Sequence, residues 1–295
     1  MEEFFSIMMW PLMASLLLPG LLVYLGLHII RREIIFVDLA LAQVAALGTC
    51  VSILLGNDAH AWQTYVWSVS FTLIGAVIFT LTRTKKNHHV PQEALIGIIY
   101  VVAAAAGILL LSRSPEGNEE LRHTLVGDLL HLQQAGHVLK PFALYVLVGI
   151  IHFIFRKKFM ILSFEPDTAM AKGMSVRWWD FIFYALFGIV VTTFVQIGGV
   201  LLVFSYLIVP AVCANFLASQ LRWMLLLGWI AATLASVLGL FASYEFDLPT
   251  GAAIVCTLGG ELVLVLSGVM LVNIFRRNGS QKILDQNRAK QVEPK

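Results

Sequence analysis

The chain has 295 residues, of which 59% are hydrophobic and only 13% are charged. Because soluble domains carry about 25% charged residues, this composition excludes an ordinary soluble protein and predicts one that crosses a lipid bilayer repeatedly. The 20 basic and 18 acidic residues nearly balance, and we expect no nucleic-acid partner.

Nine apolar runs are long enough to cross a bilayer as helices, since about 20 residues suffice. The sixth and seventh are separated only by residues 196–199, whereas charges, prolines or glycines separate the others. We therefore expect an all-α, polytopic membrane protein with about nine transmembrane helices (8–10) over residues 1–275. The predicted runs are 8–30, 36–56, 62–82, 93–112, 138–155, 178–196, 199–217, 222–243 and 249–275.

Lysine and arginine residues cluster at alternate ends of successive runs, which predicts the cytoplasmic side. With the N-terminus outside and the C-terminus in the cytoplasm, all of the 20 basic residues lie inside except Arg113, Arg122 and Lys140. Residues 276–295 then form a basic, polar cytoplasmic tail. Acidic residues gather outside, where they either attract cations or merely complement the same rule.

Two polar side chains interrupt the second run, RREIIFVDLALAQVAALG at 31–48. Asp38 lies about one turn inside the expected helix and Gln43 lies deeper, and ionisable residues in spans usually face the bundle interior. Either Asp38 pairs with Arg31 or Arg32 as an end-of-helix feature, or the two polar groups lie on the path of a transported ion. Carboxylate and amide oxygens suit ions harder than zinc.

An outer segment, SRSPEGNEELRHTLVGDLLHL at 112–132, is rich in metal-ligand residue types. If it is helical, Glu119 and His123 lie four residues apart and Glu120 and His123 lie three apart. A carboxylate and the imidazole could then share a divalent ion at the entry to the path. The alternative is a solvated loop without a metal.

An inner segment, residues 161–180, predicts a short helix on the cytoplasmic surface. Glu165 and Pro166 begin it, with the proline at an early position and Asp167 near the positive end of the helix dipole. Gly173 ends it. A permease offers such a capped helix to a groove on an ATPase, although an ordinary amphipathic connector would also fit.

Catalytic motifs are missing from the sequence. There is no HExxH, no GxSxG and no GxxxxGK[ST] phosphate loop. Many spans without a sizeable soluble domain favour a transporter or channel, and we expect no enzyme activity. If transport is driven by ATP, another chain must hydrolyse it.

Four stretches, in order, resemble the permease subunits of zinc, manganese and iron ABC importers, the ABC-3 family. In FEPDTAMAKGM the family's acid, proline, alanine four residues after the acid and glycine eight after it correspond to Glu165, Pro166, Ala169 and Gly173. The resemblance extends over residues 20–275. The other three stretches are ALIGIIYVVAAAAGILLLS…LVGDLL (94–130), GGVLLVFSYLIVPAVCA (198–214) and SYEFDLPTGAAIV (243–255).

The resemblance implies a homodimeric permease of the type II importer class in the bacterial cytoplasmic membrane. Its partners would be a cytoplasmic ATP-binding subunit, an extracytoplasmic metal-binding protein and the surrounding lipid. Residues 164–174 would form the coupling helix, with Asp167 among its contact residues. The cargo would be a divalent metal ion, ATP would bind the partner subunit, and no cofactor would be bound permanently.

The second run departs from the family, which has Gly-Asp and then a histidine four residues after the aspartate. Here Val37 precedes Asp38, Ala42 stands at the plus-four position, and Gln43 takes the place of the histidine when the stretch is aligned from Gly48. We therefore predict the permease of a metal-ion importer. The alternatives are a permease of the same architecture for a metal chelate or another small substrate, and a membrane scaffold or receptor.

Overall fold

The computed structural model describes residues 2–59, 61–83, 91–112 and 135–292, together with residues 127, 129 and 132. Within these segments the chain forms helices joined by short turns. The helices are α1 (Glu2–Leu17), α2 (Pro19–Arg31), α3 (Val37–Leu54), α4 (Trp62–Leu81), α5 (Gln92–Leu111), α7 (Ala135–Ile154), α8 (Arg156–Phe164), α9 (Pro166–Ala171), α10 (Val176–Leu217), α11 (Leu221–Phe246) and α12 (Thr250–Val292).

Helix α10 is twice as long as a membrane requires. Its 42 residues would extend about 63 Å if straight, whereas the hydrocarbon core is about 30 Å thick. Gly199 breaks it with φ 73° and ψ 166°, a conformation that glycine adopts readily because it has no Cβ. The halves match the predicted runs 178–196 and 199–217. Counting them separately, the eight apolar stretches of the described residues confirm an all-α protein with about nine spans.

A second break divides the first span, Met8–Arg31, into α1 and α2. Pro19 occupies the first turn of α2, where its missing N–H costs little. Leu18 still donates its N–H to the carbonyl oxygen of Ala14, so the chain stays helical up to the break. The two helices therefore act as one membrane crossing with a bend.

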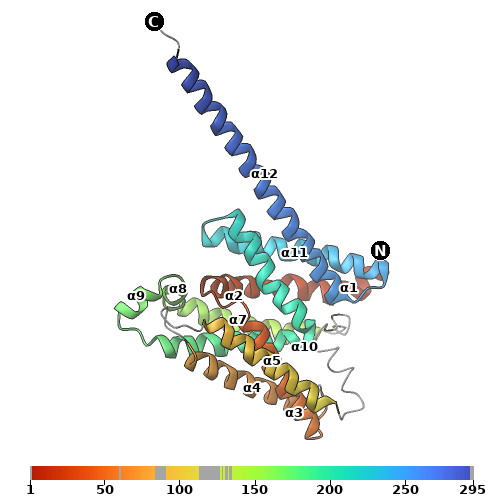
Figure 1. The fold of residues 1–295 in the computed structure, drawn as a ribbon. Coiled ribbons are helices and arrows are strands. Elements are labelled where there is room, and N and C mark those ends of the chain that lie inside the picture. The colour runs from red at the N-terminus through yellow and green to blue at the C-terminus, as the bar shows by residue number, and fades with distance from the viewer. Residues whose placement is uncertain are drawn as a thin grey trace.

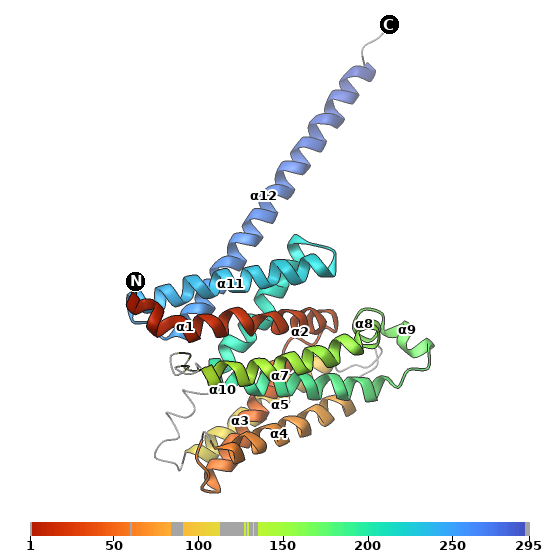
Figure 2. The ribbon, with the colours of Figure 1, turned by 180° about the vertical axis from the view of Figure 1, so that it is seen from behind.

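Helix α3 lies inside the bundle, packed against α4, α5 and α10 (Figure 1). The short helices α8 and α9 lie at one end of the bundle and the N-terminus lies at the other, as both views show (Figure 2). Aromatic residues of α4 and α10 fill the interior, where Phe79, Phe183 and Phe187 are completely buried. This arrangement places the start of α3 at the same end of the bundle as α8 and α9.

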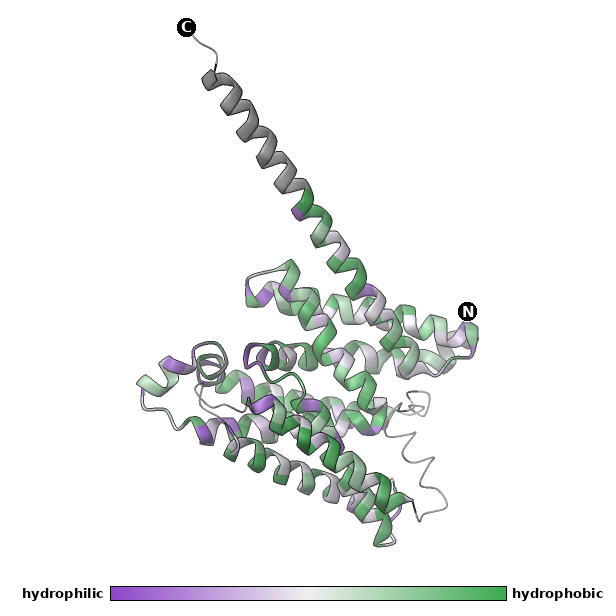
Figure 3. Cartoon of the chain, viewed as in Figure 1, coloured by the Kyte–Doolittle hydropathy of each residue, from purple (hydrophilic) through white to green (hydrophobic). Residues whose placement is uncertain are grey.

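The long helices consist mostly of hydrophobic residues (Figure 3), and many of their large apolar side chains are exposed, as contact with lipid tails requires. Leu109 of α5 and Leu264 of α12 are more than two-thirds exposed, at 72% and 73%. Hydrophilic residues gather instead at the bundle ends, including α8 and α9 (Figure 3). Helix α12 leaves the bundle and continues as a helix to Val292, through most of the segment predicted as a polar tail (Figure 1).

Candidate functional site: a buried aspartate and a cytoplasmic coupling segment

Asp38 lies in the first turn of α3 and is only 1% exposed. Among the described residues, neither of its carboxylate oxygens has a hydrogen-bond partner. The N-terminal end of a helix favours a negative charge because its first N–H groups point outward unpaired. The result is a buried carboxylate whose oxygens remain available to a cation.

The two arginines that could have paired with Asp38 point elsewhere. Arg31 donates from Nη2 to Oδ1 of Asn215 at 3.3 Å, and Arg32 pairs with Asp180. The end-of-helix alternative for Asp38 is therefore not the arrangement in this structure.

Gln43 is also buried, with 9% exposure, but it does not share a helix face with Asp38. Five residues of α-helix correspond to about 500° of rotation, so the two side chains leave α3 in directions about 140° apart. They lie about 7.5 Å apart along the helix axis. A single ion held by both side chains would need oxygen ligands from another element as well.

The other predicted metal ligands, Glu119, Glu120 and His123, lie outside the described residues. Within the described part of the chain, no three or more histidine, cysteine, aspartate and glutamate side chains gather as a metal site. Glu261, near the middle of the α12 span, is half-buried, and its Oε2 atom has no hydrogen-bond partner there. The outer-loop site therefore stays a prediction.

A short helix is present where the sequence predicts one, as α9, which follows α8 after the single residue Glu165. Pro166 begins α9, and a left-handed Gly173 (φ 68°) follows its end. The N–H of Met174 bonds the carbonyl of Ala169 and the N–H of Gly173 bonds that of Met170, which is the Schellman pattern of helix termination. The sequence is therefore built to stop this helix after less than two turns.

Helix α9 is anchored on one side and open on the other. Ala169 is completely buried, whereas Pro166, Asp167 and Met170 are exposed, Met170 by 57%. Glu165, which precedes the helix, is exposed as well. This face, with a proline, two acids and a methionine, is accessible to another protein at the end of the bundle.

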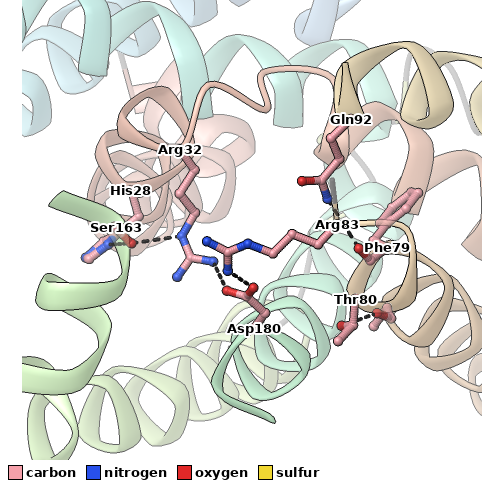
Figure 4. A network of polar contacts seen from close by, with 9 residues as sticks. His28, Arg32, Phe79, Thr80, Arg83, Gln92, Ser163 and Asp180 are labelled. Atoms are coloured by element: carbon pink, nitrogen blue, oxygen red, sulfur yellow. Dashed lines mark hydrogen bonds and ion pairs between the residues drawn. The ribbon is translucent and has the colours of Figure 1, made fainter. Parts of the chain in front are cut away.

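Polar side chains from four segments, one of them the α8 helix that precedes α9, meet around Arg32 (Figure 4). Arg32 donates from Nε to Oγ of Ser163 at 2.8 Å and from Nη1 to Oδ1 of Asp180 at 2.9 Å. Arg83, which follows α4, makes a second ion pair with Asp180. His28 of α2 contacts the same serine hydroxyl, with Nδ1 and Oγ 2.8 Å apart.

This cluster carries two positive charges and one negative charge in a largely dry environment. The side chains of Arg32 and Asp180 are 7% and 0% exposed, and that of Arg83 is 29% exposed. The Arg32 guanidinium also lies 3.8 Å from the ring centroid of Phe183, a cation–π contact. Burial lowers the pKa of Arg32, and Tyr184 opposes this shift.

From the sequence, Arg32 was expected only as a possible partner of Asp38, and no site role was expected for Ser163, Arg83 or Asp180. One indication was available, because Asp180 is an acid at the edge of an apolar span and therefore needs a partner. Its two arginines lie about 100 and 150 residues away, and no pattern in the sequence connects them.

When the chain is compared with known protein families, residues 4–271 match the family model described as "ABC 3 transport family". The manganese import system permease protein ScaB of Streptococcus gordonii is 31% identical over 232 residues, covering 79% of this chain and 80% of ScaB. The manganese transport system membrane protein MntC of Listeria innocua is 26% identical, with 78% of this chain and 79% of that protein covered.

Among solved structures, PsaBC from Streptococcus pneumoniae in complex with Fab matches with a TM-score of 0.74 and 26% identity. The match covers 90% of this chain and 94% of that one. A metal-chelate type ABC transporter in an inward-facing conformation matches with a TM-score of 0.65 at 16% identity, covering 89% and 84% of the two chains, and shows a likeness of fold alone.

Proposed function

The chain belongs to the ABC 3 transport family, and from that premise we propose that it is the membrane-spanning permease of an ATP-driven importer of divalent metal ions. The observation that carries the proposal is Asp38, a carboxylate that is buried in a span and has no partner among the described residues. An uncompensated charge in a membrane interior is costly, so such residues mark the paths of ions.

We propose manganese as the preferred ion. The relatives ScaB and MntC are named as manganese permeases, and the position of the family's histidine holds Gln43 here. Without that imidazole, Asp38 and Gln43 offer oxygen ligands only. Oxygen ligands suit manganese better than zinc, for which nitrogen and sulfur ligands are usual.

Energy for transport comes from ATP bound to a separate cytoplasmic subunit, which contacts the exposed face of α9. Two features support this contact. The Schellman hydrogen bonds end α9 at a fixed length, and the buried Ala169 anchors the helix on the bundle. Glu165, Asp167 and Met170 lie on the accessible side. A short rigid helix transmits a displacement to the bundle without bending, whereas a flexible loop would absorb it.

The remaining partners follow from the family. An extracytoplasmic protein delivers the ion to the end of the bundle that holds the N-terminus, and two copies of the permease enclose the path. With the N-terminus outside, the basic segment after α4, the α8–α9 segment and the end of α12 all face the cytoplasm, as the distribution of lysine and arginine predicts. Asp38 then lies at the cytoplasmic side of the membrane.

The test is metal uptake in bacterial cells that lack their own high-affinity importers and express this chain with its ATPase and binding protein. We expect ATP-dependent accumulation of manganese in preference to zinc and iron, and its loss in the Asp38→Ala variant. Accumulation that survives this substitution would remove Asp38 from the path. If none of the three ions accumulates while a metal chelate does, the chelate alternative holds and the free-ion proposal fails.

A further inference from the structure

We propose that Arg32, together with Ser163 and Asp180, is the joint through which movement of α9 reaches the helix that carries Asp38. This inference rests on the proposed function, because it assigns a coupling role within the same transport cycle. These three residues are called the Arg32 joint below. They are positioning residues, since none of them needs to touch the ion or ATP.

The first link runs from α9 to Ser163. Ser163 lies in the last turn of α8, and only Phe164 and Glu165 separate it from the first residue of α9. Leu162 and Phe159 of α8 are buried, at 2% and 0% exposure, so α8 is seated in the bundle. A displacement of α9 therefore moves Ser163 by nearly the same amount.

The second link is the guanidinium of Arg32. Its Nε and Nη1 atoms donate to Ser163 and Asp180 at 2.8 and 2.9 Å, and its plane contacts the ring of Phe183. A guanidinium is planar and holds two acceptors in a fixed relative geometry, which the single ammonium of lysine does not do. Because the side chain is almost completely buried, water cannot replace either acceptor cheaply.

The third link is the backbone from Arg32 to Asp38, which is only six residues long. The N–H of Arg32 bonds the carbonyl of His28, which ties it to the end of α2. The turn is tight, because Ile34 donates to the carbonyl of Ile29 and Val37 donates to that of Ile34. Ile34 and Val37 are also buried, at 3% and 0% exposure. Movement of Arg32 thus reaches the first turn of α3.

Asp180 supplies the fixed point of the joint. It is completely buried in α10 and is also paired with Arg83, which follows α4, and both helices pack against α3. Ser163 of α8 and Asp180 of α10 hold the guanidinium from two different helices. A shift of α8 relative to α10 must therefore move Arg32 or break one of its two hydrogen bonds, and either event changes the surroundings of Asp38.

A buried ion pair does not by itself indicate a role in stability, because well-packed apolar residues often replace such a pair without loss. The contact with Ser163 is harder to explain as packing. It joins the arginine to the segment that leads into α9, whereas the ion pair with Asp180 alone would neutralise the charge. The hydrogen bond between Arg32 and Ser163 is therefore better explained as a mechanical connection between Arg32 and α8 than as a contribution to stability.

The experiment uses the complete complex of permease, ATPase and binding protein in proteoliposomes, with manganese uptake and ATP hydrolysis measured together. Ser163→Ala removes the hydroxyl that both Arg32 and His28 contact, and it leaves the ion pair of Arg32 with Asp180 intact. Its matched control is Ser236→Ala in α11, since Ser236 is also buried and bonded to a side chain, Tyr206, at 2.6 Å. Arg32→Lys keeps the positive charge but loses the planar guanidinium that holds two acceptors at once. Its control is Arg31→Lys.

We expect Ser163→Ala and Arg32→Lys to hydrolyse ATP as the parent complex does but to move about threefold to tenfold fewer ions per ATP, as loss of one or two buried hydrogen bonds would allow. The two controls should keep the parent ratio. An unchanged ratio in Ser163→Ala and Arg32→Lys would overturn the joint. A proportional fall of uptake and hydrolysis also leaves this ratio unchanged, and it is the result of a purely structural role.

A second measurement separates failure of the joint from failure of the proposed function. Spin labels at Lys157 of α8 and at Leu55 after α3, both exposed, are placed in a chain whose exposed Cys256 is replaced by serine. Trapping the ATPase with ATP and vanadate should change their distance, and Ser163→Ala should diminish that change. An equal change in both chains overturns the joint. If the parent complex moves no metal, the proposed function fails and this distance still decides the joint.

Discussion

Asp180 and Asp38 are both aspartates near the start of a long helix, and each is at most 1% exposed. Asp180 is paired with Arg32 and Arg83, whereas Asp38 has no hydrogen-bond partner among the described residues. Similar burial therefore accompanies opposite electrostatic environments. The paired aspartate holds helices together, and the unpaired one is left free to receive a positive charge.

The largest difference between the two aspartates should appear in stability. Asp180→Ala leaves two arginines without their shared partner, and we expect it to lower the free energy of unfolding by about 3–5 kcal/mol. Asp38→Ala removes an uncompensated buried charge, so its stability should be equal to or higher than that of the parent chain. Thermal unfolding of the purified permease in detergent measures both. If Asp38→Ala is as damaging as Asp180→Ala, Asp38 has a structural partner and the contrast fails.

The polar groups that α3 offers to an ion can be changed at Gln43. Gln43→His brings back an imidazole on α3, and we expect it to shift the preference from manganese toward zinc by about tenfold, since nitrogen ligands favour zinc. Competition between the two ions for uptake measures the shift. Gln43→Asn, which keeps the amide, is the control. Equal selectivity in all three chains would show that Gln43 does not face the ion.

Glu261 provides an intermediate case, because it is half-buried within the α12 span and its Oε2 has no partner in the described part of the chain. If it helps to attract the cation, Glu261→Gln should raise the manganese concentration for half-maximal uptake by about threefold. Glu245→Gln, outside this span at the exposed end of α11, serves as the control. A wild-type concentration dependence would leave Glu261 without a part in ion entry.

The smallest effect is expected from the predicted outer-loop site, because solvent would weaken the attraction between charges in such a loop. Replacing Glu119, Glu120 and His123 together by alanine should raise the manganese concentration for half-maximal uptake by about twofold. Transport at saturating manganese should not change. The same concentration dependence as in the parent chain would favour the solvated-loop alternative.

Much of the fold could be predicted from local patterns. The apolar runs gave the spans, and the short stretch 196–199 contains the break that the structure places at Gly199. The α9 segment was predicted from Pro166 and Gly173 because helix starts and stops depend on a few adjacent residues. The helical continuation of α12 to Val292 was not predicted, since residues 276–295 contain no apolar span.

The candidate site was predicted less completely. Sequence reasoning singled out Asp38 but left open whether Arg31 or Arg32 neutralises it. That question depends on where those arginines point, and their partners, Asn215 and Asp180, come from a distant helix. Proximity along the chain could not decide between the two alternatives, because Coulomb attraction depends on tertiary distance and burial.

The bent helix α10 has a consequence for how the chain enters the membrane. No charged residue lies between Asp180 and Arg222, so the turn at Gly199 carries nothing that resists passage through the hydrocarbon layer. Arg177 and Arg222 flank the whole segment and retain both of its ends on one side. During synthesis the two halves can therefore insert together as a helical hairpin, without export of a polar loop.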